Sequence, residues 1–184
     1  MLKSVAALPN VPEDVIADAV KASQAMSGDY ERRQFLAQSI ARQPVTSKSA
    51  ADVLQSAAGI RADNEQATLL VDLVRRGGLT DETAGSFFPV VAAMTSSYEQ
   101  RRVLLAVLAG PHLSESIITG LLKTAASINS SFERAEILVA TARKQPLSAA
   151  ARSLYLTAAD TLRSEHDQTR VFAELVRAER AIKK

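Results

Sequence analysis

The 184-residue chain has no cysteine or tryptophan and few aromatic residues, glycines and prolines. Without cysteine, disulfide frameworks, thiolate metal sites and thiol nucleophiles are excluded. No apolar run approaches the roughly 20 residues of a membrane-spanning helix, and the N-terminus lacks the apolar region of a secretory signal. Neither sign of charge is in large excess, because the chain has 22 Lys and Arg and 20 Asp and Glu. A net charge of +2 is too small to indicate nucleic acid binding without a local basic patch.

What the chain does contain is an internal repeat of 34 residues. Five segments align without insertion or deletion, at residues 28–32, 62–66, 96–100, 130–134 and 164–168. An acidic residue occupies the fourth position of each segment, and apolar residues recur two positions before the segment and four positions after the acid. The acidic column reads Glu31, Glu65, Glu99, Glu133 and Asp167. Such regularity predicts one structural unit repeated along the chain.

Each repeat predicts two helices. The first begins at Ser96, Ser130 and Ser164 in the later repeats, each with an acid three residues on, which is the spacing of a capping box. Glycine or proline then marks a turn, after which a second set of N-cap residues begins the next helix. These residues are Thr46, Thr80, Ser114 and Ser148. Apolar residues follow at spacings of three and four, as on one face of a helix.

The predicted fold is therefore all-α, an α-solenoid of tandem antiparallel helix pairs with about ten helices, a superhelix of the tetratricopeptide or HEAT kind. A single array should span residues 1–184, with repeats at about 26–59, 60–93, 94–127 and 128–161. Partial repeats should occupy residues 1–25, where residues 2–8 resemble the last turns of a first helix, and residues 162–184. These ends lack the polar caps of most solenoids, so we expect neighbouring segments or a second copy, through end-to-end self-association, to cover them.

The sequence offers no arrangement of residues suited to catalysis. The two histidines, His112 and His166, are far apart and have no carboxylate cluster at metal-ligand spacing nearby. A Gly-x-Ser-x-Gly elbow and a Gly-rich phosphate loop are both missing. We expect no enzyme activity, no metal and no cofactor, and we interpret the acidic column as helix caps.

Two columns of the repeat are candidates for binding. The first lies near the start of each first helix and would suit a peptide or a partner helix, although packing of its rings on the adjacent turn is the favoured alternative. It consists of Tyr30, Asn64, Tyr98, Phe132 and His166. The second is a basic strip at the ends of first helices, where cations also suit the helix dipole. It consists of Arg42, Arg75, Arg76, Arg143, Lys144 and Arg177, and is interrupted at Ala109 and Gly110.

The recurring unit, apolar-x-Ser-Ser/Asp-Tyr/Phe-Glu-Arg followed by paired leucines, resembles a bacterial helical-hairpin repeat. Residues 26–36, 94–105 and 128–138 carry the resemblance, and residues 60–70 and 162–172 carry it more weakly. It is similar to repeats in extracytoplasmic regions of beta-lactam-sensor membrane metallopeptidases and related envelope proteins. The tetratricopeptide pattern, with its Trp and Gly-x-x-Tyr, is missing, as is the His-Glu-x-x-His motif of the peptidases. The resemblance implies an adaptor surface and slightly favours a periplasmic over a cytoplasmic location, but it implies no peptidase activity.

These observations predict a non-catalytic module that binds a protein or peptide, as a sensor or scaffold part of a bacterial signalling or envelope protein. The first alternative is a helical-repeat protein that binds nucleic acid along the basic strip. The second is a structural spacer without a ligand of its own. No membrane insertion of this segment is expected.

Overall fold

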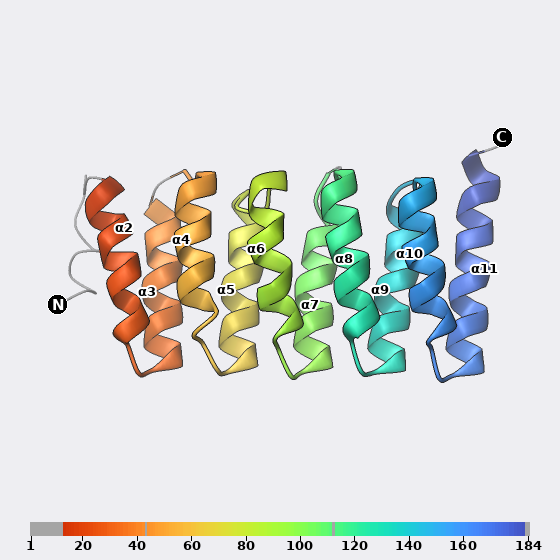
Figure 1. Cartoon of the computed structure of the whole chain (residues 1–184), viewed down its shortest axis with the longest axis horizontal. Coiled ribbons are helices and arrows are strands. Elements are labelled where there is room, and N and C mark those ends of the chain that lie inside the picture. Colours follow the sequence, from red (N-terminus) through yellow and green to blue (C-terminus); the bar gives the residue numbers. More distant parts are fainter. Residues whose placement is uncertain (1–12, 43, 112, 183–184) are drawn as a thin grey trace. The chain divides into compact units, whose positions relative to one another are not determined.

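A computed structural model describes residues 13–42, 44–111 and 113–182. Over these residues the chain forms ten α-helices, one short 3₁₀-helix and no strand, which confirms the all-α prediction (Figure 1). The segment at residues 2–8 and His112 lie outside the described residues. The chain divides into two compact units, residues 1–90 and 91–184. The single array across both units stays a prediction.

The first unit contains helices α2 to α5 and most of α6. Their bounds are α2 Glu13–Ala22, α3 Asp29–Arg42, α4 Ser47–Ala57, α5 Asp63–Arg75 and α6 Asp81–Ala92, with the 3₁₀-helix η1 at Ser23–Ala25. Second helices pack on second helices, as α2 does on α4, and first helices pack on first helices, as α3 does on α5. Figure 1 shows the two layers, with α2 and α4 in front of α3 and α5. This layering is that of an α-solenoid.

The second unit repeats the same arrangement. Its helices are α7 Ser97–Leu108, α8 Glu115–Ser127, α9 Ser131–Lys144, α10 Ala149–Asp160 and α11 Glu165–Ile182. The first helices α7, α9 and α11 pack side by side, and α8 packs on α10 in the other layer. Each predicted repeat therefore does form a pair of helices.

The predicted N-caps are confirmed in the second unit. The hydroxyls of Ser96, Ser130 and Ser164 each accept a hydrogen bond from the backbone N–H three residues on, at 3.2–3.3 Å. Ser114 and Ser148 do the same at the start of the second helices α8 and α10. These bonds satisfy donors that would otherwise be free in the first turn of a helix.

Ala62 cannot cap α5 with its own side chain, and the preceding repeat supplies the acceptor instead. Asp29 Oδ2 accepts from the backbone N–H of Arg61 at 3.1 Å and of Ala62 at 2.9 Å. In the second unit Ser131 takes the same position, because its hydroxyl accepts from the N–H of Arg163 at 3.1 Å. A cap provided by one repeat to the next thus holds neighbouring first helices in register.

The core consists of apolar columns that recur every 34 residues. In the first helices, leucines with 0% exposure occupy the same column, at Leu36 and Leu70 in one unit and at Leu104 and Leu138 in the other. In the second helices, the corresponding column is Val53, Phe87, Leu121 and Tyr155, each at most 1% exposed. A helix pair cannot bury these faces alone, so each repeat depends on its neighbours.

A buried polar column joins each first helix to the turn before it. This carbonyl-binding column, which directly follows the acidic column, consists of Arg32, Gln66, Gln100, Arg134 and Gln168. The Gln66 amide donates to the carbonyls of Ala57 at 2.8 Å and Ile60 at 3.2 Å, where the preceding second helix ends. The Gln100 amide donates to the carbonyls of Val91, Ala92 and Met94 at 3.1–3.4 Å. Such bonds satisfy carbonyls that have no partner within the helix.

Arginine performs the same role with an added cost. Arg134 donates from Nε to the Ile128 carbonyl at 3.1 Å and from Nη1 to the Thr161 hydroxyl at 2.6 Å. Burial, and then the nearby charge of Arg163, lower the pKa of Arg134 from its ordinary value. The guanidinium nevertheless remains charged at neutral pH, because its ordinary pKa is so high.

We predict that Gln100→Ala destabilises the second unit by about 1–3 kcal/mol, because it removes the amide donor to the carbonyl of the buried Met94. Gln168→Ala is the matched control, since it removes the same atoms from a side chain whose one carbonyl contact, to Ala159, is 3.5 Å long. The free energy of unfolding, measured by urea titration followed by circular dichroism, should fall clearly more for Gln100→Ala. Equal losses would contradict a capping role for this column.

Candidate binding surface

The predicted aromatic–polar column lies at one position of the repeat, the second residue of each first helix. Tyr30 begins α3 and Asn64 begins α5 in the first unit. Tyr98, Phe132 and His166 take this position on α7, α9 and α11 in the second unit. We call these five residues the aromatic column.

The side chains of this column are exposed. Tyr30 is 49% exposed, and Tyr98 and Phe132 are each 54% exposed, while Asn64 and His166 are exposed as well. These exposures leave about half of each ring open to solvent, and packing of the covered half on the preceding turn or the adjacent repeat stays a prediction. The core beside them is already filled by Phe35, Val103 and Ile137, which are at most 1% exposed.

Both tyrosines are stacked against an arginine one turn further along the same helix. The Arg33 guanidinium carbon lies 5.0 Å from the centre of the Tyr30 ring, and that of Arg101 lies 5.2 Å from the centre of the Tyr98 ring. Cation–π contacts of this kind hold an exposed ring in one orientation. The two contacts lie 68 residues apart, which is two periods of the repeat.

The same arginines also pair with the acidic column of the next repeat. Arg33 Nε lies 2.8 Å from Glu65 Oε2, and Arg101 Nε lies 2.8 Å from Glu133 Oε2. Each arginine thus connects a ring in its own repeat to a carboxylate in the following one. The sequence predicted only a capping role for these acids and gave no role to the arginines, although arginine recurs three residues after both Tyr30 and Tyr98.

The other three members of the column have no such arginine. Ala67, Ala135 and Thr169 occupy the position where Arg33 and Arg101 stand. Phe132 is an exposed ring without a polar atom, and His166 Nδ1 lies 3.8 Å from Asp167 Oδ1 with its side chain 88% exposed. The second unit therefore presents two exposed rings, Tyr98 and Phe132, on the adjacent first helices α7 and α9.

Two arginines of the basic strip share one carboxylate in the second unit. Arg143 and Arg177 both donate to Glu174 Oε2, at 2.8 and 2.9 Å. Lys144 donates from Nζ to the backbone carbonyl of Gly110. In the first unit Arg75 and Arg76 are exposed, while Arg42 lies at the end of α3 and its side chain is outside the described part of the chain.

The shared carboxylate has a shifted titration. The hydrogen bond from Arg143, supported by the charges of Arg143 and Arg177, lowers the pKa of Glu174 below its ordinary value. The same hydrogen bond raises the pKa of Arg143. Burial, with a smaller contribution from Glu174, raises the pKa of Tyr155, whose hydroxyl donates to the Val171 carbonyl at 3.0 Å.

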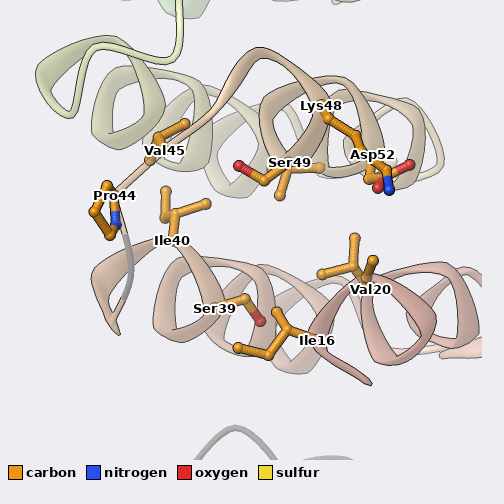
Figure 2. A pocket seen from close by; sticks show the side chains of 11 residues that line it. Ile16, Val20, Ser39, Ile40, Pro44, Val45, Lys48, Ser49 and Asp52 are labelled. Carbon is orange, nitrogen blue, oxygen red and sulfur yellow. The ribbon is translucent and has the colours of Figure 1, made fainter. Parts of the chain in front are cut away.

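A mostly apolar pocket lies in the first unit between α2, α3 and α4. Ile16 and Val20 of α2 line it on one side, Ile40 of α3 on another, and Lys48 and Asp52 of α4 lie along its edge (Figure 2). It forms where the core column of the second helices has the small Val53, whereas later repeats place Phe87, Leu121 or Tyr155 there.

Across residues 13–42, 44–111 and 113–182, no cluster of His, Asp and Glu side chains could hold a metal ion. A search of the same residues finds no helix that combines the length and the apolar character needed to cross a membrane.

We predict a pH-dependent contribution of Glu174 to stability. Because the folded pKa is lowered, the stabilisation is complete above the ordinary glutamate pKa of 4.5 and is lost as the pH falls through the folded pKa. Glu174→Gln should therefore cost a few tenths to about 1 kcal/mol at pH 7, because both arginines are largely solvated. The difference in unfolding free energy between native protein and variant should shrink toward zero at pH 3.

Asp160→Asn serves as the control, since it removes an exposed carboxylate for which the described residues provide no ion pair. A difference for Glu174→Gln that stays constant between pH 7 and pH 3 would rule out the titration as its cause.

Comparisons with known protein families, curated proteins and solved structures find no match to this chain.

Proposed function

We propose that this chain is a non-catalytic helical-repeat module that binds a protein or peptide through the aromatic column. The observation that carries the proposal is the exposure of Tyr30, Tyr98 and Phe132 at one repeated position, about half of each ring being open to solvent. Tyrosine is enriched among the residues that dominate binding energy at protein interfaces. Tyr98 and Phe132 of the second unit, one repeat apart, suit an extended peptide or a partner helix, which also presents side chains at regular intervals.

The stacked arginines support binding rather than a purely structural role for the tyrosines. Arg33 and Arg101 restrict the orientation of Tyr30 and Tyr98, and their charges are partly balanced by Glu65 and Glu133. A ring that is already oriented loses less conformational entropy when a partner packs on it. The open part of each ring is then available to the partner.

The basic strip supports the nucleic-acid alternative less well. A continuous row of cations free to contact phosphates is what such binding requires. In the second unit Arg143 and Arg177 share one carboxylate, and Lys144 contacts a backbone carbonyl. Arg75 and Arg76 of the first unit are the strongest support for this alternative, and two neighbouring cations make a short patch.

The resemblance to bacterial envelope repeats adds a biological setting to the proposal. In that setting the chain is a sensor or scaffold part of a larger signalling or envelope assembly, on the periplasmic side. A spacer without a ligand is the remaining alternative, and it gives no reason for exposed rings to recur at one position.

Peptides selected from a random display library on the immobilised native protein provide a direct test. We expect Tyr98→Ala and Phe132→Ala to weaken the binding of the selected peptides by roughly tenfold or more, as loss of a central interface ring does. Helix content by circular dichroism should stay nearly unchanged, because both rings lie outside the core. Lys123→Ala, an exposed change on the second helix α8, is the control.

Selected peptides that bind native protein and both ring variants equally would contradict the role of the column. A large fall in melting temperature for Tyr98→Ala would show that the ring is structural.

Gel-shift titrations with single-stranded RNA and duplex DNA at low salt separate the nucleic-acid alternative. We expect no shift for the native protein, because most cations of the strip in the second unit already have partners. A shift that disappears with rising salt and in the double variant Arg75→Ala/Arg76→Ala would favour that alternative over a peptide partner.

A further inference from the structure

The outer face of α11 is exposed and partly apolar. Thr169, Phe172, Ala173 and Val176 lie along it, and Arg177 and Arg180 lie toward its end. Figure 1 shows α9 and α10 on the opposite side of this helix. Val176 is 44% exposed, whereas the residue at the same repeat position in α9, Ala142, is 3% exposed. The part of a first helix that neighbouring helices cover on α9 is therefore open on α11.

The start of α2 carries a second exposed surface among the residues that the structure describes. Val15 is 42% exposed, and Asp14 and Asp18 are exposed on either side of it. One repeat later the same positions are Lys48, Ser49 and Asp52 of α4, which line the pocket against α2 and α3. Positions that face a preceding repeat on α4 are thus open on α2.

The pocket in Figure 2 shows how a second helix sits against the first helix of its own pair. Lys48, Ser49 and Asp52 of α4 lie along the same pocket as Ile40 at the end of α3 and Pro44 and Val45 in the turn that follows. Four repeats later, the positions of Ile40, Pro44 and Val45 are occupied by Val176, Arg180 and Ala181 of α11. The second helix that would complete this pair is not among the described residues.

Helix α2 of a second copy fits this position in both shape and charge. If it took the place beside α11 that α4 has beside α3, Val15 and Val176 would line one contact, as Ser49 and Ile40 line the pocket in Figure 2. In an antiparallel pair the start of one helix lies beside the end of the other, so the acidic start of α2 meets the basic end of α11. The described residues provide no ion pair for Asp14, Asp18 or Arg180.

We propose that copies of this chain associate head to tail, with α2 of one copy packed on the outer face of α11 of the next. The contact joins two different surfaces, so every bound copy presents a further free surface and the association can continue beyond two copies. The apolar contact between Val15 and Val176 would supply attraction, and the aspartates and Arg180 would set the register. This proposal is independent of the aromatic column, which lies at the opposite ends of the first helices.

Light scattering and sedimentation velocity across a concentration series test the proposal. The native protein should show an average mass that rises with concentration past that of a dimer. Arg180→Glu, and separately Asp14→Arg/Asp18→Arg, should each weaken association by roughly tenfold or more, because like charges then meet at the contact. Arg75→Glu, an equal charge change at an exposed residue elsewhere, should leave the association unchanged.

Mixing the two charge variants gives the sharpest result. When the two variants alternate, one kind of contact joins native Arg180 to the native aspartates, and the other joins the introduced glutamate to the introduced arginines. Opposite charges meet at both contacts, so association should return to near the native level. Val176→Asp should weaken association without loss of helix content, since the residue is already exposed.

A native protein that stays monomeric at every concentration would overturn the proposal and leave the outer face of α11 to another occupant. A fixed dimer, or a mixture that fails to restore association, would overturn the head-to-tail arrangement. Loss of peptide binding by the aromatic column would affect neither result.

Discussion

Each repeat depends on hydrogen bonds between a buried side chain and the carbonyls of the turn before it. Gln66 in one unit and Gln100 in the other reach back from the first turn of a first helix to the end of the preceding second helix. These carbonyls have no partner within their own helix, and water is excluded from them. The bond fixes the angle of the turn, and the apolar columns can then meet their neighbours at the same place in each repeat.

Some of the charged residues around this frame pair with one another. Arg33 with Glu65 and Arg101 with Glu133 connect neighbouring first helices, while Glu174 holds two arginines at once. Exposed pairs of this kind contribute little free energy each. These pairs change the surface more than they change the stability. Where a cation is paired with a carboxylate, the electrostatic field at the surface is small, and the exposed rings are the most distinctive feature there.

The two surfaces with proposed roles differ in origin. The aromatic column lies at a position that the fold does not need for packing, so its side chains are free to serve a partner. The outer face of α11 and the start of α2 lie at positions that the fold uses elsewhere for packing, where Ala142 is buried but Val176 is open. The first surface is therefore suited to a foreign ligand, and the second is suited to another repeat.

The sequence alone determined the all-α class, the 34-residue period, the helix pairs and nearly all of the caps. These features depend on residues close together in the chain, such as Ser130 and Glu133, or on one short pattern recurring along it. The sequence also marked Tyr30, Tyr98 and Phe132 as a column, but it left open whether the rings are core or surface. A repeating pattern shows which residues share one side of a helix. It does not show how much of that side the neighbouring helices cover.

Only the tertiary structure decided the exposure of those rings, the stacking of Arg33 and Arg101 on the tyrosines, and the capping of the turn before α5 by Asp29. It also decided that Arg143 and Arg177 converge on Glu174. Each of these features either involves residues of different helices or depends on which side chains fill the neighbouring core. Arg33 and Arg101 contact a tyrosine three residues away and a glutamate about one repeat away, and the second distance is established only when the helices pack.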